Sequence, residues 1–139
     1  VEKYNLQDKI RIVDHCRDMP AAYMLSTIVV SASTDPEGFG RVPVEAQAMG
    51  RIAIATDHGA ATETVRSGET GWLVPPGNAT ALASAIDRSL AMSDSERVKM
   101  ATRAMANVEE NFTREQMVNQ VFDVYADILK NQDQAQAEN

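Results

Sequence analysis

Two glutamates frame a glycine-containing segment that is suited to binding a ligand. Glu37 and Glu45 lie eight positions apart, and Gly38 and Gly40 stand between them. A carboxylate accepts hydrogen bonds through both oxygens, so each glutamate is suited to a vicinal diol of a ribose or a hexose. The glycines let the backbone approach a ligand closely. Taken by themselves, the same residues also fit a solvated loop glutamate followed by an acidic first helical turn.

The pattern around the glutamates predicts a strand, a loop and a helix. The apolar residues 27–31 indicate a buried strand, and residues 42–49 indicate a helix with Pro43 in its first turn and Gly50 at its end. In an open parallel sheet, ligands bind outside the carboxyl ends of the strands. The unpaired N–H groups at the start of a helix suit a phosphate. We therefore expect a phosphate-bearing ligand at this junction.

Four short apolar runs predict the strands that position this segment. They cover residues 10–13, 27–31, 52–56 and 72–74. Most of them lack strict alternation, as expected for strands that are covered on both faces. Helices are predicted between them, the first one short, with Asp18 as its cap and Pro20 near its first turn. The chain is therefore expected to form an α/β fold, with a partial Rossmann-like parallel sheet of about four strands flanked by helices.

The C-terminal third is predicted to be helical. Asn78 or Thr80 begins one helix, Ser93 and Glu96 form a capping box for the next, and Thr113 and Gln116 repeat that box. The last helix has a continuous apolar face at helical spacing, which we expect to cover the sheet. Its apolar residues are Met117, Val118, Val121, Phe122, Tyr125, Ile128 and Leu129. Residues 132–139 form a polar tail that is expected to be disordered.

Length, charge and cysteine content exclude several functions. The 139 residues suit one domain, and the net charge of −7 argues against nucleic acid as a partner. The single cysteine, Cys16, excludes an internal disulfide framework and a cysteine-rich zinc site. Residues 19–34 form the longest uncharged stretch, but it contains Pro20 and several hydroxyl residues and is a poor membrane span. We expect a cytoplasmic protein.

Three segments together resemble one enzyme family. The sequence Glu37-Gly38-Phe39-Gly40, followed by Glu45 and the strand at 52–56, resembles the E-x7-E motif of retaining glycosyltransferases of family 4, formerly group 1. Residues 57–63 (DHGAATE) are similar to its GG-x-x-E turn, and residues 68–78 (GETGWLVPPGN) to its G-x-TG-x-LVPPGD stretch. The resemblance covers roughly residues 8–130.

The resemblance implies a fold, a reaction and a set of site residues. Family members have the GT-B architecture of two Rossmann-like domains, and residues 1–131 would be an incomplete C-terminal, donor-binding domain. The implied donor is a nucleotide-diphospho-sugar, from which a hexosyl group is transferred with retention, without a metal or a cofactor. Glu37 would be catalytic and lie by the donor sugar, and Glu45 would hold the ribose hydroxyls. Donor contacts would also come from the backbone N–H groups of Gly38, Phe39, Gly40, Arg41 and Val42.

The chain also departs from the family pattern. It lacks the opening strand with its G-R turn, the E-K-G segment and the N-terminal acceptor domain, so we expect it to be inactive alone. The two strands that would separate residues 10–13 from residues 27–31 have no match. We therefore expect dimerisation through the open edge of strand 27–31, a strand swap, or movement of residues 10–13 into the gap. The full-length protein would include an acceptor domain, and membrane association is one expectation for it.

A second function remains open on the sequence. The chain would then be a non-catalytic module that binds a nucleotide-sugar or a protein partner. The nucleotide base, the sugar and the acceptor are not specified by these motifs.

Overall fold

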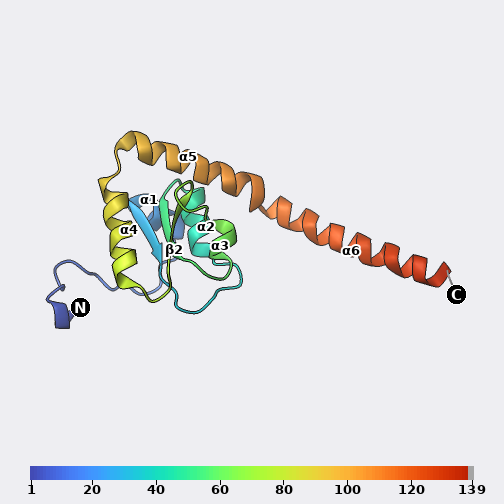
Figure 1. Cartoon of the computed structure of the whole chain (residues 1–139), viewed down its shortest axis with the longest axis horizontal. Coiled ribbons are helices and arrows are strands. Elements are labelled where there is room, and N and C mark those ends of the chain that lie inside the picture. The colour runs from blue at the N-terminus through green and yellow to red at the C-terminus, as the bar shows by residue number, and fades with distance from the viewer. Residues whose placement is uncertain (138–139) are drawn as a thin grey trace.

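A three-stranded parallel sheet forms the centre of the fold. The computed structural model describes residues 1–137 of the chain (Figure 1). The strands β1 (Ile28–Ser31), β2 (Ile52–Thr56) and β3 (Gly71–Val74) pair in the order β1-β2-β3. Ile28 lies opposite Ile52, and Ile54 lies opposite Trp72. All three strands run in one direction, so their carboxyl ends share one edge of the sheet.

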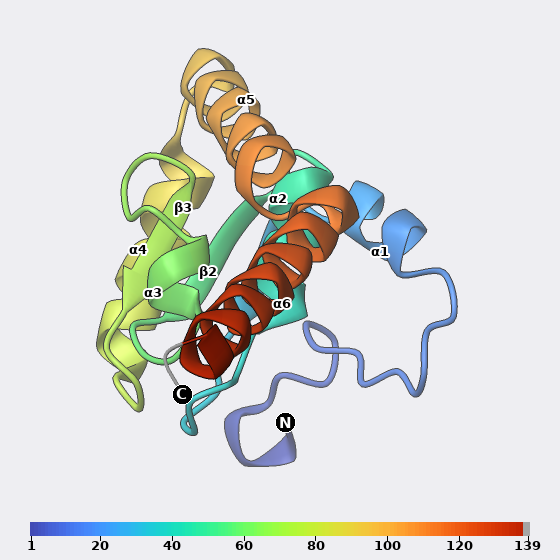
Figure 2. The ribbon, with the colours of Figure 1, turned by 90° about the vertical axis from the view of Figure 1, so that its right-hand side faces the viewer.

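Helices cover both faces of the sheet, which explains why β2 is buried along its whole length. On one face, Ala53 packs with Tyr23 and Ala46, which belong to α1 (Met19–Leu25) and α2 (Arg41–Ala48). On the other face, Ile54 packs with Ala85 of α4 (Ala79–Ala91). The remaining elements are η1 (Glu2–Tyr4), α3 (Ala61–Thr64), α5 (Asp94–Asn111), which packs on α2, and α6 (Arg114–Ala137) (Figure 2).

The helices begin at the residues that the sequence predicts. The Asp18 carboxylate accepts a hydrogen bond from the Ala21 N–H at 3.1 Å, and Asn78 Oδ1 accepts one from the Ala81 N–H at 2.9 Å. Ser93 and Glu96 form the complete capping box of α5. At the start of α6, the Gln116 N–H donates to Thr113 Oγ1, but the Gln116 side chain donates to the Glu110 carbonyl, so this cap is only half of a box.

The predicted strand at residues 10–13 is wrong. This segment lies outside the sheet, with Ile12 84% exposed and Val13 71% exposed, and the described residues form three strands rather than four. The segment does not fill the free edge of β1. An extended segment becomes a strand only when its backbone groups pair with a neighbouring strand. Within residues 1–137, no strand lies beside residues 10–13 to pair with them.

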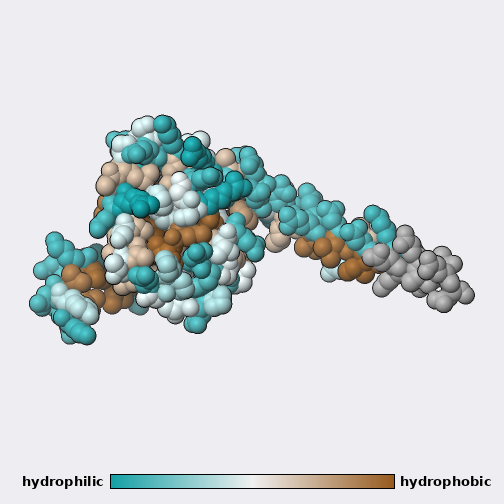
Figure 3. All heavy atoms as spheres, in the orientation of Figure 1, coloured by the Kyte–Doolittle hydropathy of each residue, from teal (hydrophilic) through white to brown (hydrophobic). Residues whose placement is uncertain are grey.

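The expectation that the last helix covers the sheet is also wrong. Helix α6 projects away from the domain, and its apolar side chains lie on the surface, with Phe122 68% exposed and Leu129 61% exposed (Figure 3). The core on the two faces of the sheet is formed by α1, α2 and α4 instead.

The end of the chain falls partly outside the described residues. The backbone of α6 continues to Ala137, and residues 138 and 139 lie beyond the part that the structure describes. The disorder expected for residues 132–139 stays a prediction. Among residues 1–137, every helix is too short or too polar to cross a bilayer.

Candidate functional site

The loop between β1 and α2, residues 32–40, carries most of the predicted site residues to the edge where the strands end. Gly40 is the N-cap of α2, has a φ of +65°, and provides no side chain to cap the first turn. The N–H groups of that turn have no partner within the helix, and the helix dipole adds partial positive charge there. This end of α2 is therefore suited to an anion, as the sequence predicts.

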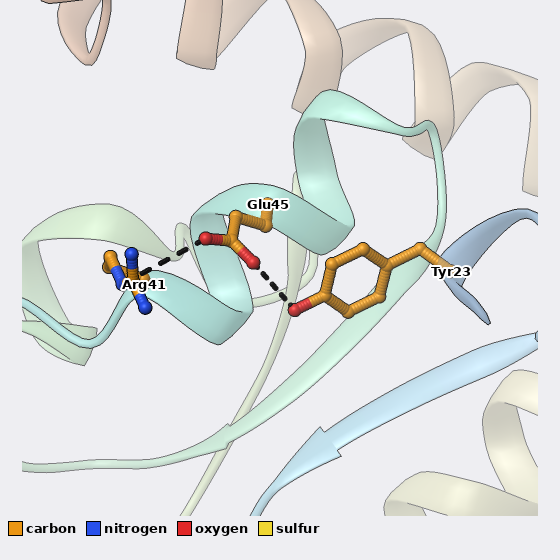
Figure 4. A network of polar contacts seen from close by, with 3 residues as sticks. All are labelled: Tyr23, Arg41 and Glu45. Atoms are coloured by element: carbon orange, nitrogen blue, oxygen red, sulfur yellow. Dashed lines mark hydrogen bonds and ion pairs between the residues drawn. The ribbon is translucent and has the colours of Figure 1, made fainter. Parts of the chain in front are cut away.

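Glu45 is fixed by a buried tyrosine. Tyr23 Oη on α1 donates a hydrogen bond to Glu45 Oε2 at 2.8 Å, across 22 positions of sequence (Figure 4). The Glu45 side chain remains 40% exposed. Because a carboxylate has about four acceptor positions, Glu45 can bind Tyr23 and still accept hydrogen bonds from a ligand diol.

The tyrosine is held in its neutral form. Tyr23 is only 4% exposed, and burial together with its hydrogen bond to the Glu45 carboxylate raises the pKa of Tyr23 to about 12. At neutral pH the phenol is therefore a donor to Glu45 and never a competing anion.

Arg41 lies on the solvent side of Glu45. Its Nε is 3.9 Å from Glu45 Oε1, and its side chain is 83% exposed (Figure 4). An exposed ion pair one helical turn apart contributes only a few tenths of a kcal/mol. Arg41 is therefore free to exchange this contact for a ligand phosphate.

Glu37 lies exposed in the loop, with its carboxylate beside the start of α2. A Cβ atom placed on Gly40 would lie 3.4 Å from Glu37 Oε2. The loop therefore brings one predicted carboxylate to the first turn of α2 while Glu45 lies on the next turn of the same helix.

A small hollow lies at the carboxyl ends of β1 and β2. Its volume is about 10 Å³, and its lining includes Glu37, Gly40 and His58. His58 Nε2 lies 3.0 Å from the Ser33 carbonyl oxygen, and Thr56 Oγ1 donates to the same oxygen at 2.8 Å. His58 follows β2 and reaches the ligand edge of the sheet, as the parallel order predicts.

A larger groove of about 750 Å³ lies beside Phe39, where α5 ends and α6 begins. The rings of Phe39 and Phe112 meet edge to face with centroids 6.2 Å apart. The polar residues that line the groove include Glu63 and two cations, Arg66 and Arg114. Reasoning from the sequence missed Tyr23, Phe112 and these arginines. Of these residues, only Tyr23 could have been identified from the sequence. A tyrosine in a short apolar helix is expected to be buried, and its hydroxyl then needs a hydrogen-bond partner.

Curated proteins and solved structures resemble this chain over most of its length. A lipopolysaccharide core biosynthesis mannosyltransferase, LpcC of Rhizobium leguminosarum bv. viciae, is 33% identical over 129 residues, which are 89% of this chain and 35% of the relative. A glycosyltransferase structure from Rickettsia africae ESF-5 superposes with a TM-score of 0.88 at 38% identity, over 94% of this chain and 35% of that one.

A second similar structure contains a ligand. It is Anabaena Alr3699/HepE in complex with UDP-glucose, with a TM-score of 0.84 and 27% identity over 91% of this chain and 34% of that one. The chain thus spans about a third of the length of the relatives that it matches. The pattern of the family described as glycosyl transferases group 1 matches residues 1–107. With the parallel sheet and the glutamate-bearing loop at its ligand edge, this match shows that the chain belongs to the glycosyl transferases group 1 family.

Proposed function

We propose that this chain is the donor-binding part of a retaining glycosyltransferase of family 4, and that it holds a nucleotide-diphospho-sugar at the start of α2. Glu45 binds the ribose hydroxyls, and Glu37 is the catalytic carboxylate beside the donor sugar. The backbone N–H groups of residues 38–42 contact the sugar and the diphosphate. The group transferred is a hexosyl unit, and transfer needs the remaining two thirds of a family member's length.

One observation carries the proposal. Glu45 stands on the second turn of a helix with an uncapped start, with one oxygen fixed by Tyr23 at 2.8 Å and 40% of its side chain exposed. A fixed carboxylate next to an anion-binding helix end matches the two parts of a nucleotide, its diol and its phosphates. The complex of HepE with UDP-glucose supports the choice of a uridine donor as the first probe.

The reaction follows from the chemistry of such a donor. The bond between the anomeric carbon and the diphosphate oxygen breaks, the acceptor hydroxyl oxygen bonds to that carbon on the same face, and the hydroxyl proton leaves with the diphosphate. The dipole of α2 and the Arg41 guanidinium stabilise the departing negative charge, so the proposal includes neither a metal nor a cofactor. Exposed Cys16 suits a reducing cytoplasmic setting.

The alternative function uses surfaces rather than the donor site. The free edge of β1 leaves unpaired backbone groups at Ile28–Ser31, and such an edge accepts a strand from another chain. A partner-binding module, including a homodimer formed through this edge, would need no nucleotide-sugar. Under the first proposal, the partner is the acceptor domain of a longer protein, whether or not that protein associates with a membrane.

Saturation-transfer NMR and calorimetry test the two functions on the full-length gene product. We expect the protein to bind UDP or another nucleoside diphosphate. Glu45→Ala should weaken this binding at least about tenfold, because the ribose hydroxyls lose their acceptor. Glu109→Ala, which changes an exposed glutamate on α5, should leave binding unchanged.

The two functions give different results in this experiment. Binding that does not depend on Glu45 would contradict the ribose assignment. No binding of any nucleotide or nucleotide-sugar, together with concentration-dependent dimerisation, would favour the alternative.

A further inference from the structure

We propose that the turn between β2 and α3 positions Glu37, through Thr56, His58 and Gly59, and so sets the contact of Glu37 with the donor sugar. This inference rests on the proposed function of Glu37. The three residues are positioning residues, because they touch the loop that carries Glu37 rather than the donor itself.

The first two contacts fix the point where the chain leaves β1. Thr56 Oγ1 donates to the Ser33 carbonyl oxygen at 2.8 Å, and His58 Nε2 lies 3.0 Å from the same oxygen. A carbonyl oxygen only accepts, so His58 Nε2 carries the proton. Two donors, one on the last residue of β2 and one just after that strand, thus converge on one acceptor at the beginning of the loop. Ser33 Oγ continues the chain of contacts by donating to the Asp35 carbonyl at 2.8 Å.

The second ring nitrogen of His58 is unpaired among the described residues. This atom, Nδ1, is buried. The small hollow that His58 lines is also lined by Glu37 and Gly40. His58 therefore holds the loop with one ring nitrogen and lines the same hollow as Glu37.

The third contact fixes Glu37 itself. The Ala60 N–H donates to the Glu37 carbonyl oxygen at 3.1 Å. Gly59 has a φ of +55°, and a Cβ atom there would lie 2.7 Å from the Glu37 oxygen and 3.0 Å from its nitrogen. The backbone of Glu37 therefore rests directly on Gly59, in space that any other side chain would occupy.

These contacts explain how an exposed loop holds a defined carboxylate. Residues 34–39 are all exposed, and a Cβ on Gly38 would meet no atom within 4 Å. Packing within the loop is thus too sparse to fix Glu37. The neighbouring turn fixes both the Ser33 carbonyl and the Glu37 backbone. The Glu37 carboxylate itself stays exposed beside the start of α2.

Gly59→Ala and Gly77→Ala form a matched pair for the test. Both glycines have left-handed backbones, with φ of +55° and +70°, but a Cβ at Gly77 meets nothing within 4 Å. Both variants should lose stability through backbone strain, and Gly59→Ala should lose more, because its Cβ must also displace the Glu37 backbone. In the full-length gene product, only Gly59→Ala should weaken UDP-sugar binding by about tenfold while UDP binding changes little. Equal effects of the two variants on UDP-sugar binding would overturn the proposal.

The histidine is tested by removal and rescue. His58→Leu removes the donor to Ser33 and should reduce the preference for UDP-sugar over UDP, whereas His58→Gln keeps an N–H donor of similar reach and should restore most of it. Each change should have no further effect in a Glu37→Ala background, because the turn acts through Glu37. Full additivity with Glu37→Ala would contradict the proposal.

Hydrogen exchange separates this inference from the proposed function. Without any ligand, the amide of Ala60, which donates to the Glu37 carbonyl, should exchange faster in Gly59→Ala and His58→Leu, but not in Gly77→Ala. Unchanged exchange in all variants overturns the positioning role even if Glu37 binds the sugar. If exchange is faster in these variants but Glu37→Ala does not change UDP-sugar binding, the contacts hold the loop and the proposed role of Glu37 is wrong.

Discussion

Tyr23 and Glu45 form a hydrogen bond of 2.8 Å between a buried phenol and a half-exposed carboxylate, and this bond joins α1 to the helix that begins at the candidate site. The bond fixes one oxygen of Glu45 and leaves the rest of the carboxylate to a ligand. Its strength can be measured because phenylalanine has the same ring without the donor.

Tyr23→Phe should weaken nucleotide binding by about three- to tenfold and lower the free energy of unfolding by about 1 kcal/mol. The carboxylate would lose its fixed donor and turn toward Arg41, which lies 3.9 Å away in the native chain. Calorimetric titration with UDP and urea denaturation measure the two effects. Tyr4→Phe is the control, because Tyr4 is 68% exposed; an equal loss in the control would contradict the prediction.

Alkaline pH should remove the contribution of the tyrosine to stability. The pKa of Tyr23 is raised from 10.0 to about 12 by burial and by Glu45, so the folded state favours the neutral phenol. This contribution is complete below pH 10 and is lost as the pH rises toward 12. The stability of the wild type relative to Tyr23→Phe should therefore fall in that range. If the denaturation midpoints of the wild type and of Tyr23→Phe change in parallel from pH 9 to 12, this explanation is excluded.

Gln47 should be more sensitive to truncation than to loss of polarity. Its side chain is fully buried, and Nε2 donates to the Pro43 carbonyl at 3.2 Å and to the Thr64 carbonyl at 3.0 Å. Gln47→Ala should cost about 2–4 kcal/mol through the cavity it leaves. Gln47→Met should cost less than about 1.5 kcal/mol, because Asn107 Nδ2 still donates to the Thr64 carbonyl. Thermal and urea unfolding rank the variants, and equal losses would contradict the cavity explanation.

The exposed face of α6 should contribute little to the stability of the 139-residue chain. Phe122 is 68% exposed, so Phe122→Ala should change the free energy of unfolding by less than about 0.5 kcal/mol. Met100→Ala, at a side chain that is 5% exposed, should cost about 2–5 kcal/mol. Urea denaturation compares the two. A large loss at Phe122 would mean that α6 packs against the domain, as its periodicity predicts.

The strands and the helix starts were predictable because their signals are local. The runs at 27–31, 52–56 and 72–74 match β1, β2 and β3 within one residue, and Asp18, Asn78 and Ser93 cap the helices that follow them. A cap depends on a side chain three residues from its partner, so the sequence itself contains both halves of the contact.

The two wrong predictions share one physical cause. Residues 10–13 and the apolar face of α6 have the correct composition and period, but a pattern states only which side chains are apolar. It does not state what covers them. Among the described residues no strand pairs with the first segment, and helices other than α6 form the core on the sheet.

The position of the candidate site in the fold was predictable, but the contacts that hold its residues were not. The spacing of Glu37 and Glu45 correctly placed a loop and a helix start at the strand ends. The partners that fix them are distant in sequence, since Tyr23 lies 22 positions from Glu45 and His58 lies 25 positions from Ser33. Such pairs become neighbours only through the parallel sheet order.

The sheet order has a consequence for synthesis. Each strand pairs only with the strand that precedes or follows it along the chain, as Ile28 does with Ile52 and Ala53 with Gly71. Within the part of the chain that the structure describes, no pairing awaits a distant segment, so these layers can assemble in the order in which the ribosome releases them. The Glu37 loop and the turn that contacts it are complete once residues up to Ala60 have emerged, well before α6 is made.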